Sequence, residues 1–259
     1  MNTRLLLLSL LSHLMVWNVQ AQVTVKLPPQ SVLWVGNSFF YYNNSLHGHV
    51  ANLARAGDKR IRGVSATISG SGLDWHDVGS YLRPEGIGRY SFVGDNEIRF
   101  NQTGRQFDSA VMMDCSQCPI HEKLGPVFHE TVKKHSATLR AAGVEPVLFM
   151  SWAYKDKPEM TEQLAQQYVK AGKENGALVL PVGLAFAQAI AADKNLELYV
   201  PDKRHPSLAG TYLAACVVYA SFYKQSPEGL NYTAGLDAAT VKLLQTAAWE
   251  TAKNFFQIK

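Results

Sequence analysis

The chain has 259 residues, of which 47% are hydrophobic and 18% are charged, and its formal net charge is +4 at pH 7. This length and composition suit one domain with a large core. The positive charge is small and scattered. The one basic cluster, Lys59-Arg60-x-Arg62, belongs to no stripe of basic and aromatic residues, which argues against nucleic acid as a partner.

Residues 1–21 have the pattern of a signal peptide. Arg4 supplies a positive start, Leu5–Leu11 an apolar stretch, and Val19 with Ala21 a small-x-small cleavage site. The alternative is an uncleaved membrane anchor, but polar residues interrupt the apolar run and leave it short for a bilayer span. We therefore expect an exported protein, periplasmic or secreted, with no transmembrane segment after signal removal.

Residues 22–259 predict a single domain in which apolar runs alternate with amphipathic stretches, a pattern typical of doubly wound α/β proteins. Strands are expected at Val32–Val35, Ile61–Ala66, Ala110–Met113, Pro146–Met150 and Ala177–Leu180. Helices are expected at Ser45–Ala56, Glu122–Ala142, Glu159–Asn175, Val182–Ala192, Leu208–Tyr223 and Ala238–Phe256. The predicted fold is a three-layer α/β/α, flavodoxin-like domain with a parallel sheet of about five strands.

An insertion around residues 81–106 interrupts the alternation. It is rich in glycine and contains two β-like pieces, Tyr90–Val93 and Glu97–Phe100, which predict a small hairpin. Because the insertion follows the second strand, we expect it over the sheet edge where the first strand ends.

Chemically suggestive residues follow four of the predicted strands. In strand order they are Ser38, then Gly70 and Gly72, then Ser116 and Gln117, then Trp152 and Tyr154. Parallel sheets bind ligands at the carboxyl ends of their strands, so these residues are expected on one rim.

Ser38 ends the segment Gly36-Asn37-Ser38, and Asp202 precedes His205 by three residues near the other end of the chain. A serine, a histidine and an aspartate supply the nucleophile, the base and the orienting carboxylate of acyl-transfer catalysis. The structural alternatives are that Ser38 only caps a helix and that Asp202 is an ordinary turn residue.

These two segments resemble the SGNH hydrolases, also called GDSL-type esterases, which usually carry GDS and DxxH there. The resemblance extends in order and spacing over nearly the whole mature chain, although only these two blocks match sharply. Asn37 departs from the pattern, since a neutral amide keeps the turn but removes a charge beside the serine. The resemblance implies a catalytic triad of Ser38, His205 and Asp202, with no metal and no cofactor.

The resemblance also implies an oxyanion hole built from three blocks. The backbone N–H of Ser38 is one donor, and a glycine after the second strand is another, for which Gly70 is favoured over Gly72. The family's third donor is an Asn side chain in a Gly-x-Asn context, which this chain lacks. Gln117 carries the same amide on a longer arm, and Ser116 is the alternative.

Three cysteines remain in the mature chain. Cys115 and Cys118 are close enough in sequence for a local disulfide in an oxidising compartment, whereas a thioredoxin-like redox role or a zinc site lacks the expected context. Cys216 lies in an apolar run and is expected to be buried.

The sequence thus predicts an exported serine esterase that cleaves a small acyl ester, with acetyl on a carbohydrate as the preferred substrate. Trp152 and Tyr154 are candidates to stack on the sugar or on the acyl chain. The alternative is a non-catalytic carbohydrate-binding protein on the same fold. A sulfotransferase or phosphatase is disfavoured, because the chain has no glycine-rich phosphate loop.

Overall fold

The computed structural model describes residues 28–83, 90–100 and 105–259. The predicted signal peptide, residues 1–21, lies outside the described residues, as do parts of the predicted insertion around residues 81–106.

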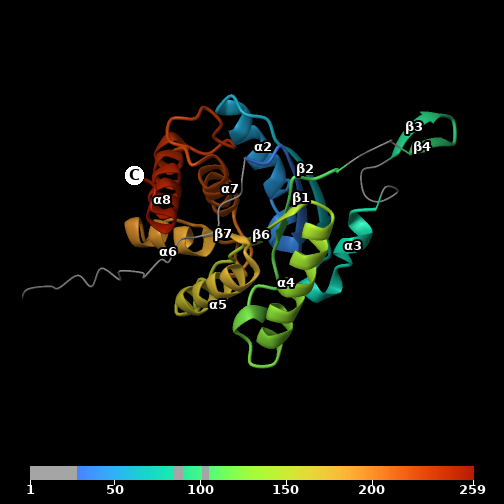
Figure 1. Ribbon diagram of the computed structural model, residues 1–259. Helices are drawn as coiled ribbons and strands as arrows, with labels where there is room; N and C mark the ends of the chain where they lie inside the picture. The colour runs from blue at the N-terminus through green and yellow to red at the C-terminus, as the bar shows by residue number, and fades with distance from the viewer. Residues whose placement is uncertain (1–27, 84–89, 101–104) are drawn as a thin grey trace, which may run out of the picture.

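Five parallel strands form the central sheet, in the order β2-β1-β5-β6-β7 (Figure 1). They are β1 (Ser31–Gly36), β2 (Arg62–Thr67), β5 (Ser109–Met112), β6 (Glu145–Phe149) and β7 (Leu178–Leu180). Numbered among themselves, these strands have the 2-1-3-4-5 order of flavodoxin-like folds. The predicted fold class is confirmed. Because the strands are parallel, the segments that follow them leave the sheet at one rim.

Helices cover both faces of the sheet and give three layers (Figure 1). One face packs against α2 (Leu46–Ala56), α6 (Val182–Ala192), α7 (Leu208–Tyr223) and α8 (Ala238–Phe256), and the other against α3 (Val78–Tyr81), α4 (Leu124–Ala141) and α5 (Met160–Asn175). Side chains of β1 alternate between the two cores: Val32 and Trp34 enter the first, and Leu33 and Val35 enter the second.

Three single turns of helix stand at the rim, each after a strand. They are α1 (Ser38–Tyr41) after β1, η1 (Leu73–Trp75) after β2 and η2 (Cys118–Ile120) after β5. The sequence pattern does not predict them, because one turn carries no apolar period. At the other end of the chain Ser207 caps α7, its Oγ accepting from the N–H of Gly210 at 3.2 Å.

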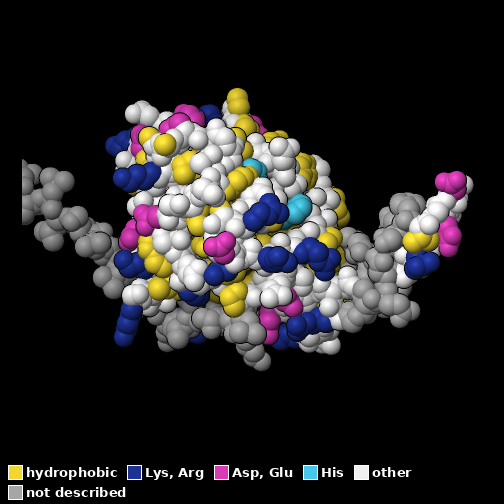
Figure 2. All heavy atoms as spheres, turned by 90° about the horizontal axis from the view of Figure 1, so that it is seen from above, with side chains coloured by type: hydrophobic (Ala, Val, Ile, Leu, Met, Phe, Trp, Pro, Cys, Tyr) yellow, Lys and Arg dark blue, Asp and Glu magenta, His cyan; other side chains and the backbone are white. Residues whose placement is uncertain are grey.

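The predicted hairpin is formed by β3 (Tyr90–Gly94) and β4 (Glu97–Phe100) as a separate antiparallel pair. The insertion was expected over the sheet edge beside Ser38, but the hairpin does not cover that edge (Figure 1). In Figures 1 and 2 it stands away from the body. The side chains of Val93, Ile98 and Phe100 are exposed. Local pairing sets the strands of a hairpin, but only packing against the body would set its position.

On the face shown in Figure 2, acidic and basic side chains are interspersed with hydrophobic ones and do not gather into one continuous stripe. Among the described residues, no helix combines the length and the apolar composition that spanning a bilayer requires.

Candidate active site

Ser38 lies on the rim of the sheet, at the junction of β1 and α1. It is the first residue of α1, so its backbone N–H is one of those that a helix leaves without an intrahelical acceptor. Asn37 caps the helix, its Oδ1 accepting from the N–H of Phe39 at 3.2 Å. The serine side chain is therefore held at the rim, and the residue is 7% exposed.

Asn37 also joins the loops that follow three different strands. Its Nδ2 donates to the carbonyl oxygen of Ser71, after β2, at 3.0 Å, and to that of Asp114, after β5, at 3.3 Å. A carboxylate has no hydrogen to donate, so an Asp would not make these two bonds. The amide, which stands where SGNH hydrolases usually have an Asp, thus has a structural role that its neighbours in the sequence do not reveal.

The structure brings together the three residues of the predicted triad. Ser38 Oγ lies 2.8 Å from His205 Nε2, and His205 Nδ1 lies 2.5 Å from Asp202 Oδ2. Because the carboxylate only accepts, Nδ1 carries a hydrogen, which leaves Nε2 free to accept from the serine hydroxyl. A serine, an imidazole and a carboxylate therefore form one directed chain of hydrogen bonds.

Asp202 is fixed by its own turn as well as by the imidazole. Its Oδ1 accepts from the backbone N–H groups of Arg204 and His205, both at 2.9 Å. Partial burial opposes ionisation, but the hydrogen bonds from the side chain of His205 and from these N–H groups lower the pKa of Asp202 to about 2. The carboxylate is thus charged at any pH near neutrality.

The loop that carries His205 is anchored at both neighbouring residues. Trp152 Nε1 donates to the carbonyl oxygen of Arg204 at 2.9 Å. Asn43 Nδ2 donates to the carbonyl oxygen of Pro206 at 3.0 Å and to Thr211 Oγ1 at 2.8 Å. The bonds of Asn43 connect the base to the segment just after the nucleophile, and the bond of Trp152 connects it to the loop after β6.

Aromatic rings of the same segment surround the imidazole. The ring of Tyr42 stacks on His205 with centroids 4.4 Å apart and planes 7° from parallel. Phe39 meets His205 edge-on at 5.4 Å. The run Phe39-Phe40-Tyr41-Tyr42 directly after Ser38 is the sequence signal of this arrangement, although an aromatic run does not by itself indicate contact with a distant histidine.

Trp152 and Tyr154 do not present free rings to a substrate, so their predicted stacking role is wrong. Trp152 is 1% exposed and lies between Phe39, at 4.5 Å, and Phe186, at 4.2 Å, nearly parallel to both. Tyr154 is buried beneath the guanidinium of Arg204, which lies 5.0 Å from its ring centroid. Both side chains support the loop of His205 or the core.

Of the two glycines proposed as the second oxyanion donor, only Gly70 faces open space. Gly70 has a φ of 69°, the left-handed region that favours glycine, and a Cβ added there would meet no atom within 4 Å. A Cβ on Gly72 would collide with Asp74 Oδ1. The preference for Gly70 over Gly72 remains a prediction.

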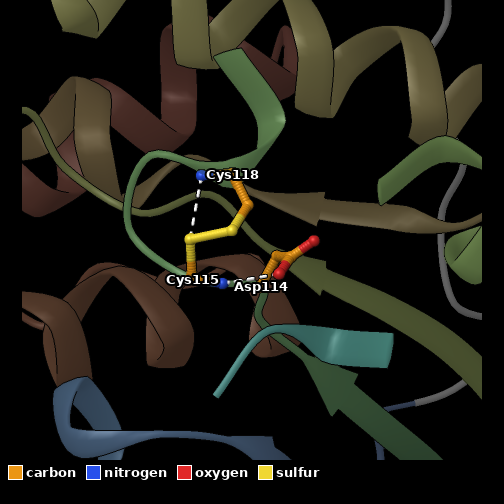
Figure 3. Close-up of side chains that lie close together, drawn as sticks. All are labelled: Asp114, Cys115 and Cys118. Carbon is orange, nitrogen blue, oxygen red and sulfur yellow. Dashed lines mark hydrogen bonds between the residues drawn. A yellow bond between two sulfur atoms is a disulfide. The ribbon is translucent and has the colours of Figure 1, made fainter. Parts of the chain in front are cut away.

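Gln117 and Ser116 follow β5 in the turn closed by a Cys115–Cys118 disulfide, which was one of the alternatives for this pair (Figure 3). Gln117 is exposed, and its side chain makes no hydrogen bond to any described residue. The Ser116 hydroxyl is 2.7 Å from the hydroxyl of Tyr154. Gln117 is thus the one with an unused amide, and its role remains a prediction.

Asp114 lies beside this disulfide, and its carboxylate and the two sulfurs are within 4.8 Å of one another (Figure 3). Because the sulfurs are bonded to each other, they offer no thiolate to a metal in this form. Asp114 Oδ1 instead accepts from the N–H groups of Leu73, at 2.9 Å, and Cys115, at 2.6 Å. Burial raises the pKa of Asp114 to about 6, although these two hydrogen bonds lower it.

Comparisons with known proteins agree with this architecture. No protein-family model and no curated protein matches the chain. Among solved structures, a DUF4886 family protein from Bacteroides uniformis has a TM-score of 0.61 at 18% identity, over 85% of this chain and 93% of that one.

Two further solved structures carry names that bear on the family. A proposed SGNH hydrolase from Slackia heliotrinireducens has a TM-score of 0.53 at 23% identity, covering 74% of this chain and 98% of that one. The psychrotrophic esterase EstA from Pseudoalteromonas sp. has a TM-score of 0.50 at 12% identity, covering 75% and 97%. At these identities the likeness shows the fold, and it confirms that the chain has the fold of SGNH-type hydrolases.

Proposed function

We propose that the protein is a serine ester hydrolase with Ser38 as nucleophile, His205 as general base and Asp202 as the orienting carboxylate. The observation that carries this proposal is the continuous hydrogen-bond chain from Ser38 Oγ to His205 Nε2 and from His205 Nδ1 to Asp202 Oδ2. The fold shared with SGNH-type hydrolases and an esterase supports it.

The geometry fits an acyl-enzyme mechanism. Ser38 Oγ attacks the ester carbonyl while its proton passes to His205 Nε2, and Asp202 stabilises the imidazolium that results. When the tetrahedral intermediate collapses, the C–O bond to the alcohol breaks and His205 returns the proton to the leaving oxygen. Water, activated by the same imidazole, then hydrolyses the acyl-serine and regenerates the enzyme.

The negative oxygen of the intermediate needs preorganised donors. We assign this role to the backbone N–H of Ser38, the backbone N–H of Gly70 and the side-chain amide of Gln117. The free N–H at the start of α1 and the exposed amide of Gln117 support the assignment.

For the substrate we propose a small acyl ester, an acetyl group on a carbohydrate, cleaved outside the cytoplasm. Export rests on the pattern of residues 1–21. It is checked by the intact mass of the exported protein, which should begin at Gln22, whereas a form that still begins at Met1 would contradict signal cleavage.

The test of the catalytic role is hydrolysis of p-nitrophenyl acetate by the mature protein. Ser38→Ala and His205→Ala should each abolish turnover above the uncatalysed rate, while Ser226→Ala, a partly exposed serine in another loop, should keep it. The structure of EstA is described as inhibited by monoethylphosphonate. A reactive phosphonate ester should accordingly modify this protein at Ser38, as read by peptide mass.

Equal turnover by the wild type and Ser38→Ala would sink the proposal. The alternative of a non-catalytic carbohydrate-binding protein would then take its place.

A further inference from the structure

The inference that follows rests on the proposed function and concerns where the alcohol portion of the ester binds. In acyl transfer the imidazole hands its proton to the leaving oxygen, so the alcohol must lie on the His205 side of Ser38. The surface next to His205 on that side is therefore the place to search for an alcohol subsite.

A groove of about 500 Å³ is lined by residues that follow the two catalytic segments closely in the chain. One wall starts at Asn44, two residues after Tyr42, whose ring stacks on the imidazole. Leu208 lines it as well, three residues after His205, a span of at most ~11 Å along the chain. Both segments that hold the imidazole thus continue into the lining of the groove.

The described residues that line this groove include no Asp, Glu, Lys or Arg. Its polar lining consists of amide, hydroxyl and imidazole groups: Asn44, His49, Asn52, Asn231, Tyr232 and Thr233. The side chains of Asn44 and Asn231 make no hydrogen bond within the described part of the chain. Two amides therefore offer unused donors and acceptors in an uncharged groove.

Hydrogen bonds connect the groove to the catalytic loop. His49 Nε2 donates to the carbonyl oxygen of Asn43 at 2.7 Å, and the Tyr232 hydroxyl lies 2.8 Å from His49 Nδ1. Asn43 in turn holds the carbonyl oxygen of Pro206, next to His205. His49 and Tyr232, which line the groove, thus belong to one hydrogen-bond network with the loop of His205.

The groove also has strained backbone in both walls. Asn43, Asn44 and Ser45 have consecutive left-handed φ angles of 53°, 64° and 71°, and Ala234 has a φ of 55°. Such conformations are strained for non-glycine residues and cluster at functional sites. A run of three is unusual, and it directs the chain from α1 into the groove wall.

We propose that this groove binds the alcohol portion of the ester, and that this alcohol is an uncharged polyhydroxy compound of the sugar class. Amides serve hydroxyl groups both as donors and as acceptors, and the ring of Tyr232 adds an apolar surface. An uncharged lining gives a cationic or anionic alcohol no ion-pair partner.

The first test measures binding without turnover. Cellobiose, a neutral disaccharide, is titrated into the mature Ser38→Ala protein and followed by ¹H–¹⁵N NMR, with choline as a cationic comparison. Cellobiose should perturb amides within residues 44–52 and 231–235, and choline should not. Perturbation elsewhere only, no perturbation at all, or a stronger response to choline would overturn the assignment.

The second test uses the double variant Asn44→Gly and Asn231→Ala. Glycine suits the left-handed backbone at position 44, so the change removes the amide without adding strain. Loss of two neutral hydrogen bonds should raise the KM for acetylated cellobiose about tenfold relative to the KM for p-nitrophenyl acetate. Asn254→Ala, an exposed asparagine on α8, is the matched control and should leave this ratio unchanged.

The two proposals fail in different ways. An unchanged KM ratio in the double variant, with hydrolysis intact, overturns the groove assignment and leaves the esterase. Absence of hydrolysis by the wild type, with cellobiose still bound in the groove of the Ser38→Ala protein, overturns the esterase and keeps the groove as a saccharide site.

Discussion

The ring of Tyr42 lies flat against the imidazole of His205, with centroids 4.4 Å apart and planes 7° from parallel. Tyr42 ends the same short segment that begins with the nucleophile, and Phe39 of that segment approaches the imidazole edge-on. One stretch of chain therefore presents Ser38 and limits the rotation of the base that activates it.

Removing this ring should slow turnover more than it weakens binding. A stacked aromatic pair is worth about 0.5–1.5 kcal/mol, so Tyr42→Leu should lower kcat up to about tenfold with little change in KM. Tyr42→Phe keeps the ring, so its kcat should equal that of the wild type. The measurement is p-nitrophenyl acetate kinetics, with thermal melting to show that both variants fold. An equal loss of kcat in Tyr42→Leu and Tyr42→Phe would assign the effect to the hydroxyl and contradict the stacking role.

Placing at position 37 the Asp that is usual in SGNH hydrolases should destabilise this protein. In Asn37→Asp the buried side chain would lose two donated hydrogen bonds and place a carboxylate against the carbonyl oxygens of Ser71 and Asp114. We expect a loss of ~2–4 kcal/mol at pH 7, measured by urea unfolding. Asn195→Asp, at an exposed position, is the control.

The loss of stability in Asn37→Asp should also depend on pH. Such an Asp has a folded-state pKa above its unfolded value, so the loss should shrink as pH falls and the carboxyl is protonated. A loss that stays constant from pH 7 to pH 4 would contradict the proposed repulsion.

Gln117→Ala tests the third oxyanion donor. If the exposed amide of Gln117 binds the developing oxyanion, its removal should lower kcat by roughly 10²–10³ and leave KM nearly unchanged, because the contact forms mainly in the transition state. Ser116→Ala is the comparison, since that hydroxyl is already paired with Tyr154. A normal kcat in Gln117→Ala would contradict the assignment. A loss of kcat confined to Ser116→Ala would assign the third oxyanion donor to Ser116.

The carboxyl of Asp114 should make stability depend on pH. Its folded-state pKa is about 6, above the ordinary value of 3.8, because of burial, so it destabilises the fold as pH rises from about 4 to about 6. Asp114→Asn keeps an acceptor oxygen for Leu73 and Cys115 but removes the charge. Relative to the wild type, the variant should gain about 3 kcal/mol between pH 4 and pH 7, by urea unfolding at each pH. A pH-independent difference would show that Asp114 does not titrate in this range.

The order of apolar runs was sufficient to predict the layers of the fold. Strands and helices long enough to carry a period, such as β1 and α7, lie within two residues of their predicted bounds. Single turns such as α1 were missed, since four residues carry no period. The hairpin of β3 and β4 was predicted correctly, but its predicted position was wrong. Alternation of apolar residues predicts which strands pair and does not predict what the hairpin packs against.

At the site, the sequence placed residues on the rim correctly and misjudged where some side chains point. Trp152 follows β6 as expected, yet Phe39 and Phe186 enclose its ring, and no local pattern links residues so far apart in the chain. Asn37 was interpreted from its neighbours alone, whereas its donors reach Ser71 and Asp114, 34 and 77 residues away. Long-range contacts, not local spacing, decide these roles.

The Cys115–Cys118 bond closes a ring across a sequence separation of only 3, and the stabilisation from a crosslink shrinks with the size of the ring it closes. Reduction should therefore leave the fold standing and free one short turn, the turn that carries Ser116 and Gln117. Two samples of the same polypeptide, one matured in an oxidising compartment and one kept reduced, would give the same circular dichroism and different turnover. The specific activity of a preparation would then depend on whether this disulfide had formed. Protein made in a reducing cytoplasm would show a lower specific activity than the oxidised protein.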